Sequence, residues 1–167
     1  MALSELPSES HITLRKMTVA DLTAVSTIEK QSTLFPWTVK HFEDCLKAGH
    51  EAWVICDNED HIISFTIVQK VVDELHLLNI CVQRQYQGLG LGKAMLNHVI
   101  HYGRQLGSVL IVLEVRRSNT KAQSLYAQAG FNEMSVRRDY YPAEEDREDA
   151  ILMGLDLGLL SLFGASS

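Results

Sequence analysis

The chain has 167 residues, 46% of them hydrophobic and 22% charged, which is typical of one globular domain that buries its own core. A net charge of −6 argues against binding to nucleic acid through a basic face. Three cysteines and seven histidines at scattered positions predict neither a disulfide framework nor a metal site. Without a long apolar run or a signal segment, we expect a cytoplasmic protein with no membrane contact.

Apolar spacing and turn residues predict the order of the helices and strands. Helices are indicated by apolar residues three and four positions apart, as at Leu91 and Met95, and strands by alternating or continuous apolar runs. In chain order we expect a strand at 12–17, a helix capped by Thr18, a helix from Thr38 to near Gly49, strands at 52–55, 62–68 and 75–82, a helix at 91–106, a strand at 109–113, a helix from Ser118 or Asn119 to Gly130, and strands at 132–138 and 150–155. This pattern predicts one α+β domain over residues 11–156, a mixed sheet covered by helices, between tails at 1–10 and 157–167.

A glycine-rich segment follows the strand at 75–82 and opens the next helix; its residues are Gln87, Gly88, Leu89, Gly90, Leu91 and Gly92. Glycines let the backbone approach a ligand closely, and the first amides of a helix lack intrahelical partners, so together they form an anion site. Lys93 in the first helical turn opposes the helix dipole unless an anion is bound. Neither the P-loop nor the dinucleotide-binding pattern fits these letters. The alternative is a glycine-rich turn that only lets the helix pack.

Three further side chains each admit a structural and a functional interpretation. Glu114 is a carboxylate at the end of an apolar strand, where burial is costly unless the group is paired with Arg116 or Arg137, solvated, or used in catalysis. Tyr126 is either a core aromatic residue or a proton donor, and Asn119 is at least a helix cap. The acidic stretch at 144–149 is a solvated loop or a contact for a basic peptide.

The segment Gln87-x-x-Gly90-x-Gly92 resembles the pyrophosphate-binding motif of the GNAT superfamily of acetyltransferases. Other blocks resemble its RimI type, the ribosomal-protein-alanine N-acetyltransferases, over nearly the whole chain. These blocks are 35–37 (Phe-Pro-Trp), 79–80 (Asn-Ile), 113–116 (Leu-Glu-Val-Arg), 118–119 (Ser-Asn), 124–126 (Ser-Leu-Tyr), 130–131 (Gly-Phe), 137–142 and 148–151. The chain departs from the pattern at Gly88 and Leu89, where relatives often carry arginines.

The resemblance implies a mostly antiparallel sheet of about seven strands with about four helices. It implies acetyl-coenzyme A as the acetyl donor, no metal, and direct transfer to the N-terminal alanine of a small-subunit ribosomal protein. Glu114 would be the general base and Tyr126 the general acid. The residues implied to bind the donor are Ile80, Cys81 and Val82 through their backbone, Gln87, Gly88, Leu89, Gly90, Leu91, Gly92, Lys93 and Asn119. We expect a peptide groove lined by Phe35, Trp37, Tyr140 and Tyr141, with a hydrophobic staple as the alternative at 35–37.

Two other functions remain open on the sequence alone. The first keeps the reaction but uses a lysine, a polyamine or a small-molecule amine as the acceptor. The second is a non-catalytic sensor of acyl-coenzyme A, against which the joint presence of Glu114 and Tyr126 argues. Cys81 has no histidine beside it in the sequence and is expected to be a buried apolar residue rather than a nucleophile.

Overall fold

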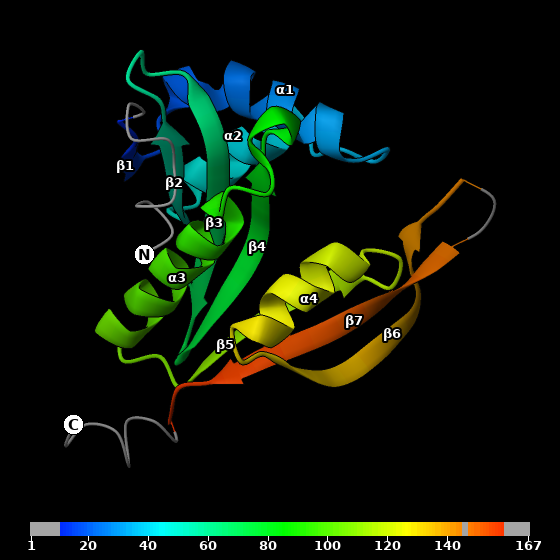
Figure 1. The fold of residues 1–167 in the computed structure, drawn as a ribbon. Helices are drawn as coiled ribbons and strands as arrows, with labels where there is room; N and C mark the ends of the chain where they lie inside the picture. Colours follow the sequence, from blue (N-terminus) through cyan, green and yellow to red (C-terminus); the bar gives the residue numbers. More distant parts are fainter. Residues whose placement is uncertain (1–10, 145–146, 159–167) are drawn as a thin grey trace. The chain divides into compact units, whose positions relative to one another are not determined.

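A computed structural model describes residues 11–144 and 147–158 of the chain (Figure 1). Seven strands and four α-helices, with two short 3-10 helices, lie in this part. The strands are β1 (Thr13–Lys16), β2 (Glu51–Cys56), β3 (Ile62–Val71), β4 (Glu74–Val82), β5 (Leu110–Arg116), β6 (Asn132–Pro142) and β7 (Arg147–Asp156). The helices are η2 (Val19–Asp21), α1 (Leu22–Ser32), α2 (Val39–Lys47), η3 (Arg84–Tyr86), α3 (Leu91–Gln105) and α4 (Thr120–Gln128).

The strands form a seven-stranded sheet in the order β1-β2-β3-β4-β5-β7-β6. β1/β2, β2/β3, β5/β7 and β6/β7 are antiparallel pairs, and β4/β5 is a parallel pair. The predicted α+β fold with a mixed, mostly antiparallel sheet is therefore confirmed. The expected tails, 1–10 and most of 157–167, lie outside the described residues.

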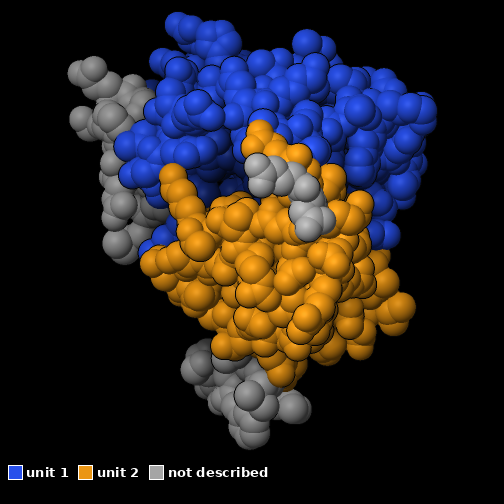
Figure 2. All heavy atoms as spheres, turned by 90° about the vertical axis from the view of Figure 1, so that its right-hand side faces the viewer, with its two compact units in different colours: residues 1–69, 79–96 blue, residues 70–78, 97–167 orange. Residues whose placement is uncertain are grey.

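The chain divides into two compact units, coloured separately in Figure 2. Unit 1 comprises residues 1–69 and 79–96, and unit 2 comprises residues 70–78 and 97–167. In unit 1 the core includes Phe42 of α2 and Phe65 of β3, whose rings meet edge to face at 5.6 Å. In unit 2 the buried residues include Ile111 of β5 and Met153 of β7.

Capping residues set several helix boundaries, as the sequence predicts. Thr18 and Asp21 form a capping box at η2, which runs directly into α1. The Thr38 hydroxyl accepts a hydrogen bond from the His41 amide at the start of α2. Asn119 caps α4 in the same way by accepting from the Ala122 amide. Each side-chain oxygen satisfies an amide that has no partner within its helix.

The C-terminal hairpin differs from the prediction. β6 extends to Pro142 and β7 begins at Arg147, so Tyr140, Tyr141, Glu148 and Asp149 lie on strands rather than on a long charged loop. The extension includes a register shift between Arg137 and Tyr141, where Asp139 has φ +53°. The strand pattern is hidden because β6 has no buried face: all of its positions except Val136 and Tyr141 are exposed.

Candidate active site

The glycine-rich segment connects η3 to α3 within unit 1, and its backbone leaves a set of amides free. Gly88 and Gly90 adopt the left-handed region, with φ of +80° and +84°. The first helical hydrogen bond of α3 is donated by the Ala94 amide to the Gly90 carbonyl oxygen, at 3.0 Å. Among the described residues, the amides of 88–93 have no hydrogen-bond acceptor. Free amides at the positive end of a 15-residue helix fit a phosphate group.

This geometry favours the anion site over a turn that serves only for packing. A packing turn would satisfy its amides with protein acceptors, whereas here six consecutive residues leave theirs unused. The Lys93 side chain is exposed in the first turn of α3, where its charge is unfavourable next to the helix dipole unless an anion is present.

The end of β4 presents alternate peptide groups on opposite edges. The Cys81 carbonyl accepts from the Ser64 hydroxyl and the Asn79 carbonyl from the Thr66 hydroxyl, each at 2.9 Å, so both face β3. In a strand, the amide and the carbonyl of one residue point to the same edge, and those of the next residue point to the opposite edge. The amides and carbonyls of Ile80 and Val82 therefore face away from β3. In agreement, the Val82 carbonyl accepts from the Gln87 side chain at 3.1 Å. Of the three backbone sites predicted on β4, Ile80 and Val82 thus have the available orientation, and Cys81 does not.

Where β4 meets β5, the parallel ladder is short. Its pairs run from Glu74 with Leu110 to Leu77 with Leu113, while β4 continues to Val82 and β5 to Arg116. The separation of the two strands near Ile80 stays a prediction.

Cys81 is half-buried rather than buried, which corrects the expectation. Its thiol lies 2.8 Å from the Ser32 hydroxyl. Burial raises the pKa of Cys81 to about 11, although the Ser32 contact opposes that shift. A thiol with this pKa is protonated near neutral pH and is a poor nucleophile, in agreement with the expected apolar role.

Glu114 occupies a half-buried position near the end of β5 in unit 2. Its side chain is 26% exposed and forms an ion pair at 3.2 Å with Arg137 of β6, whose side chain is 56% exposed. The partner that the sequence offered as a structural explanation is therefore present. An exposed arginine is free to rotate away, so this pair does not prevent the carboxylate from accepting a proton.

Tyr141 lies close enough to Glu114 for the carboxylate charge to affect its ionisation. Burial, then the Glu114 charge, raises the pKa of Tyr141 to about 12, so its hydroxyl keeps its proton. The Arg116 guanidinium lies 4.4 Å from the centre of the Tyr141 ring. The Tyr140 ring meets the Tyr141 ring edge to face at 5.0 Å. The predicted substrate residues Tyr140 and Tyr141 are thus brought together with the predicted base in unit 2.

The acidic residues of β7 do not form the solvated loop that the sequence suggested. Glu148 accepts from the Ser118 amide at 2.5 Å and from Arg116 at 3.4 Å, and these contacts hold its pKa below the usual range. Asp149 accepts from the Asp139 amide at 3.0 Å and pairs with Arg117 at 3.3 Å. Both carboxylates therefore brace the hairpin. Residues 145 and 146 lie outside the described part.

The remaining predicted residues of unit 2 lie on or before α4. Tyr126 is 6% exposed, with its ring 6.0 Å from that of Phe131. Asn119 is exposed and caps the helix, with its side-chain oxygen 3.1 Å from the Ala122 amide. Both structural interpretations are present, and neither excludes a role in binding or proton transfer.

Trp37 and Phe35 lie between α1 and α2. The Trp37 ring stacks on His41 at 3.9 Å and contacts Phe42 at 5.3 Å. Trp37 precedes the cap Thr38, and Phe42 is the fourth residue of α2, so the two form a hydrophobic staple. The alternative raised for this segment is therefore present at Trp37. Phe35 is 38% exposed and keeps an accessible face.

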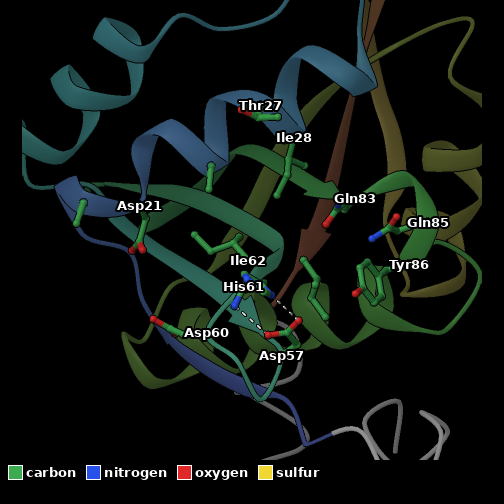
Figure 3. Close-up of a pocket in the computed structure, with 13 residues that line it drawn as sticks. Asp21, Thr27, Ile28, Asp57, Asp60, His61, Ile62, Gln83, Gln85 and Tyr86 are labelled. Atoms are coloured by element: carbon green, nitrogen blue, oxygen red, sulfur yellow. Dashed lines mark hydrogen bonds and ion pairs between the residues drawn. The ribbon is translucent and has the colours of Figure 1, made fainter.

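A pocket of about 610 Å³ opens in unit 1 beside α1, η3 and the β2–β3 turn (Figure 3). None of its lining residues is a predicted catalytic, donor-binding or peptide-binding residue. Of its carboxylates, Asp21 and Asp60 are paired with Arg15, and Asp57 lies 3.3 Å from His61. In the ranges 11–144 and 147–158, no group of three or more His, Cys, Asp or Glu is placed to hold a metal ion. In the same ranges, no helix has the length and apolar character needed to cross a membrane.

The sequence analysis missed one polar pair of unit 1. Glu29 of α1 is 6% exposed and its carboxylate accepts from the Asn79 side chain of β4 at 2.5 Å. The signal was available, because Glu29 follows Leu22 by seven positions and Val25 by four and so lies on the apolar face of α1.

Comparison with known proteins agrees with this arrangement. Residues 16–131 match the acetyltransferase (GNAT) family. The [ribosomal protein bS18]-alanine N-acetyltransferase of Escherichia coli is 39% identical over 147 residues, covering 88% of this chain and 99% of that protein. The protein of the same name from Haemophilus influenzae is 35% identical over 141 residues, 84% of this chain and 95% of its own length.

Solved structures give the same result. The crystal structure of the Escherichia coli ribosomal-protein-S18-alanine N-acetyltransferase has a TM-score of 0.82 at 39% identity, covering 87% of this chain and 94% of that one. Ard1 from Thermoplasma volcanium, at 22% identity and a TM-score of 0.80, covers 87% of this chain and 97% of its own and shares the fold. The chain therefore belongs to the GNAT family of acetyltransferases.

Proposed function

We propose that this protein transfers the acetyl group of acetyl-coenzyme A to the N-terminal alanine of a small-subunit ribosomal protein, the counterpart of bS18. The observation that carries the proposal is the run of free amides at residues 88–93, which fits the diphosphate of coenzyme A. The identity and near-complete coverage of the Escherichia coli enzyme support the choice of acceptor. We expect the protein to act in the cytoplasm.

The reaction forms one C–N bond and breaks one C–S bond. The alanine amine attacks the thioester carbonyl carbon, and Glu114 accepts a proton from the amine, directly or through a water. The amides of Ile80 and Val82 face away from β3 and are available to donate to the thioester oxygen as it gains charge. Tyr126 donates its hydroxyl proton to the departing thiolate. Proton exchange with solvent then restores both side chains.

The α-amine is a better match than lysine for a single carboxylate base. Its pKa lies near 7.7–8.0, so roughly a tenth is neutral at pH 7, whereas lysine near 10.4 is neutral about once in several thousand molecules. The proposed site has one acid, the buried Tyr126, and one base, the half-buried Glu114. No second base is proposed that would deprotonate a lysine side chain. The N-terminal acceptor therefore requires less of this site.

An experiment on the intact acceptor tests the assignment. The unacetylated small-subunit protein is incubated with the enzyme and acetyl-coenzyme A, and tandem mass spectrometry locates the new acetyl group. We expect a single acetyl on the alanine nitrogen. Acetylation of lysine side chains alone would replace the assignment by a lysine acetyltransferase, and binding of coenzyme A without any transfer would favour a sensor.

A further inference from the structure

The last turn of α1 makes two contacts with the end of β4 and one with η3, all inside unit 1. The Glu29 carboxylate accepts from Asn79, and the Ser32 hydroxyl lies 2.8 Å from the Cys81 sulfur. The Arg84 guanidinium of η3 donates to the Gln31 carbonyl at 3.2 Å. Side chains of alternate β4 residues, Asn79 and Cys81, are therefore held by one helix turn.

A carboxyl group at the position of Glu29 is costly. It is 6% exposed, and burial raises its pKa, with the Asn79 hydrogen bond opposing the shift. Replacing buried charged or polar pairs by apolar residues often stabilises a protein. Leucine would continue the apolar face of α1 formed by Leu22 and Val25. A carboxyl at this position is therefore not needed for stability, and its hydrogen-bond partner is Asn79.

Asn79 is constrained from a second side as well. The fully buried Thr66 hydroxyl donates to its carbonyl, while Ser64, also fully buried, donates to that of Cys81. Side chains are thus held by α1 and carbonyls by β3. Ile80 lies between Asn79 and Cys81, and Val82 directly follows Cys81. The backbone amides of Ile80 and Val82 face the other edge, so their direction follows from how Asn79 and Cys81 are held.

We propose that Glu29 is a positioning residue for the acetyl donor. By holding the Asn79 side chain, it fixes the backbone amides of Ile80 and Val82 in the direction that the thioester arm of the donor requires. This inference rests on the donor-binding part of the proposed function and is independent of the acceptor. Preorganised amides stabilise developing charge because they do not have to rotate during the reaction.

Four variants test the role: Glu29→Leu, Asn79→Ala, the double variant, and Glu29→Gln. Loss of the acceptor for Asn79 raises the KM for acetyl-coenzyme A about tenfold, which corresponds to about 1.4 kcal/mol. The KM of the double variant is no higher than that of the more impaired single variant, because both changes remove the same contact. Glu29→Gln keeps an oxygen for the Asn79 amide and recovers most of the affinity. The KM for the peptide and the coenzyme A-induced shifts of the Ile80 and Val82 amides in NMR spectra complete the set.

Glu51→Leu is the matched control, since it removes another carboxylate of unit 1, on β2, whose partner is Lys16. It leaves the KM for acetyl-coenzyme A unchanged. If Glu29→Leu does not fold, the positioning role is tested by Asn79→Ala and by the double variant of Asn79→Ala with Glu29→Gln. Folded variants with lowered thermal stability but wild-type KM and wild-type amide shifts overturn the positioning role and leave a structural one.

Calorimetry with coenzyme A separates this inference from the proposed function. Wild-type protein that binds coenzyme A, loses affinity in Asn79→Ala, and acetylates no alanine contradicts only the acceptor. Wild-type protein that does not bind coenzyme A contradicts both.

Discussion

Glu114 combines two features that a general base needs, partial burial and contact with solvent. The side chain of Arg137, its ion-pair partner, is more than half exposed, and its neighbour Tyr141 stays protonated. The carboxylate is therefore held in place without being sealed off from a water or an amine.

Glu114→Gln and Tyr126→Phe test the assigned proton transfers. Each variant keeps the shape of its side chain and removes one proton acceptor or donor, so we expect coenzyme A binding to persist while kcat falls about 10²-fold or more. Stopped-flow or steady-state kinetics with calorimetry on the same samples measures both. Arg137→Gln, which removes the ion-pair partner of Glu114 and the guanidinium 5.3 Å from the Tyr140 ring, is the control and keeps most of the turnover at saturating peptide. Near-normal kcat in both Glu114→Gln and Tyr126→Phe would show that the roles are misassigned.

Glu29 predicts a pH dependence of stability. Its folded-state pKa is raised, so its favourable contribution is complete below the ordinary glutamate value and is lost as pH rises through the raised folded value. Glu29→Gln cannot ionise, and we expect its melting temperature to gain on the wild type across that interval. Each kcal/mol corresponds to about 2–4 °C in a chain of this size.

Thermal unfolding of both proteins from pH 4 upward measures the difference. The nearby titratable group that responds to the Glu29 charge is the Cys81 thiol, which ionises only near 11 and does not interfere. Glu51→Gln, at a half-buried position of β2, serves as the control. A constant difference at all pH values would mean that Glu29 is not abnormal.

At the scale of elements, the junction of β4 and α3 depends on backbone conformation. Gly90 and Gly49 have nearly equal φ, +84° and +83°, and both lie in unit 1. Replacing either by alanine forces a side chain into the left-handed region at a cost of about 1–2 kcal/mol. The two substitutions therefore cause comparable losses of stability.

Function separates them. We expect Gly90→Ala to raise the KM for acetyl-coenzyme A about tenfold or more, because the loop must keep the amides of 88–93 directed at the diphosphate. Gly49→Ala, at the end of α2, leaves that KM unchanged. Equal kinetics in the two variants would mean that the loop is only a turn.

We expect substitutions of Trp37 and Phe35, which lie two positions apart, to affect different properties: stability for Trp37 and the KM for the peptide for Phe35. Trp37→Ala removes the staple to Phe42 and should lower the melting temperature by about 2–6 °C. Phe35→Ala changes an exposed ring and should alter stability little, while raising the KM for the peptide. Calorimetry and peptide kinetics on both variants measure the effects. A peptide KM that changes only in Trp37→Ala would move the groove wall to that residue.

Local signals made some elements predictable and left others hidden. Thr18 with Asp21, Thr38 and Asn119 mark helix starts through contacts within three residues, and all three act as predicted. The pairing of Glu148 with Ser118, 30 positions apart, has no local signal, so the extension of β6 and β7 was missed. A hydrogen bond between segments so far apart in the chain depends on the register of β7, which a single sequence does not specify.

For the molecule as a whole, the order of elements and the seven-stranded mixed sheet followed from periodicity and from the family resemblance. The candidate site residues, such as Gly90 and Glu114, were chosen from motif positions and stay predictions. Motif positions could not predict the direction of the backbone groups of β4. The hydrogen bonds from Ser64 and Thr66 show that the Cys81 carbonyl faces β3, while the backbone groups of Ile80 and Val82 do not. Such cross-strand pairing is decided by tertiary packing.

The most direct test of the whole account uses two peptides that differ only at the α-amine. Both carry the alanine-initiated sequence of the acceptor and at least one lysine, and in one the α-amine is blocked by a formyl group. Incubation with acetyl-coenzyme A and mass spectrometry should show acetylation of the free peptide alone, on its alanine nitrogen. Equal acetylation of the blocked peptide would contradict N-terminal transfer.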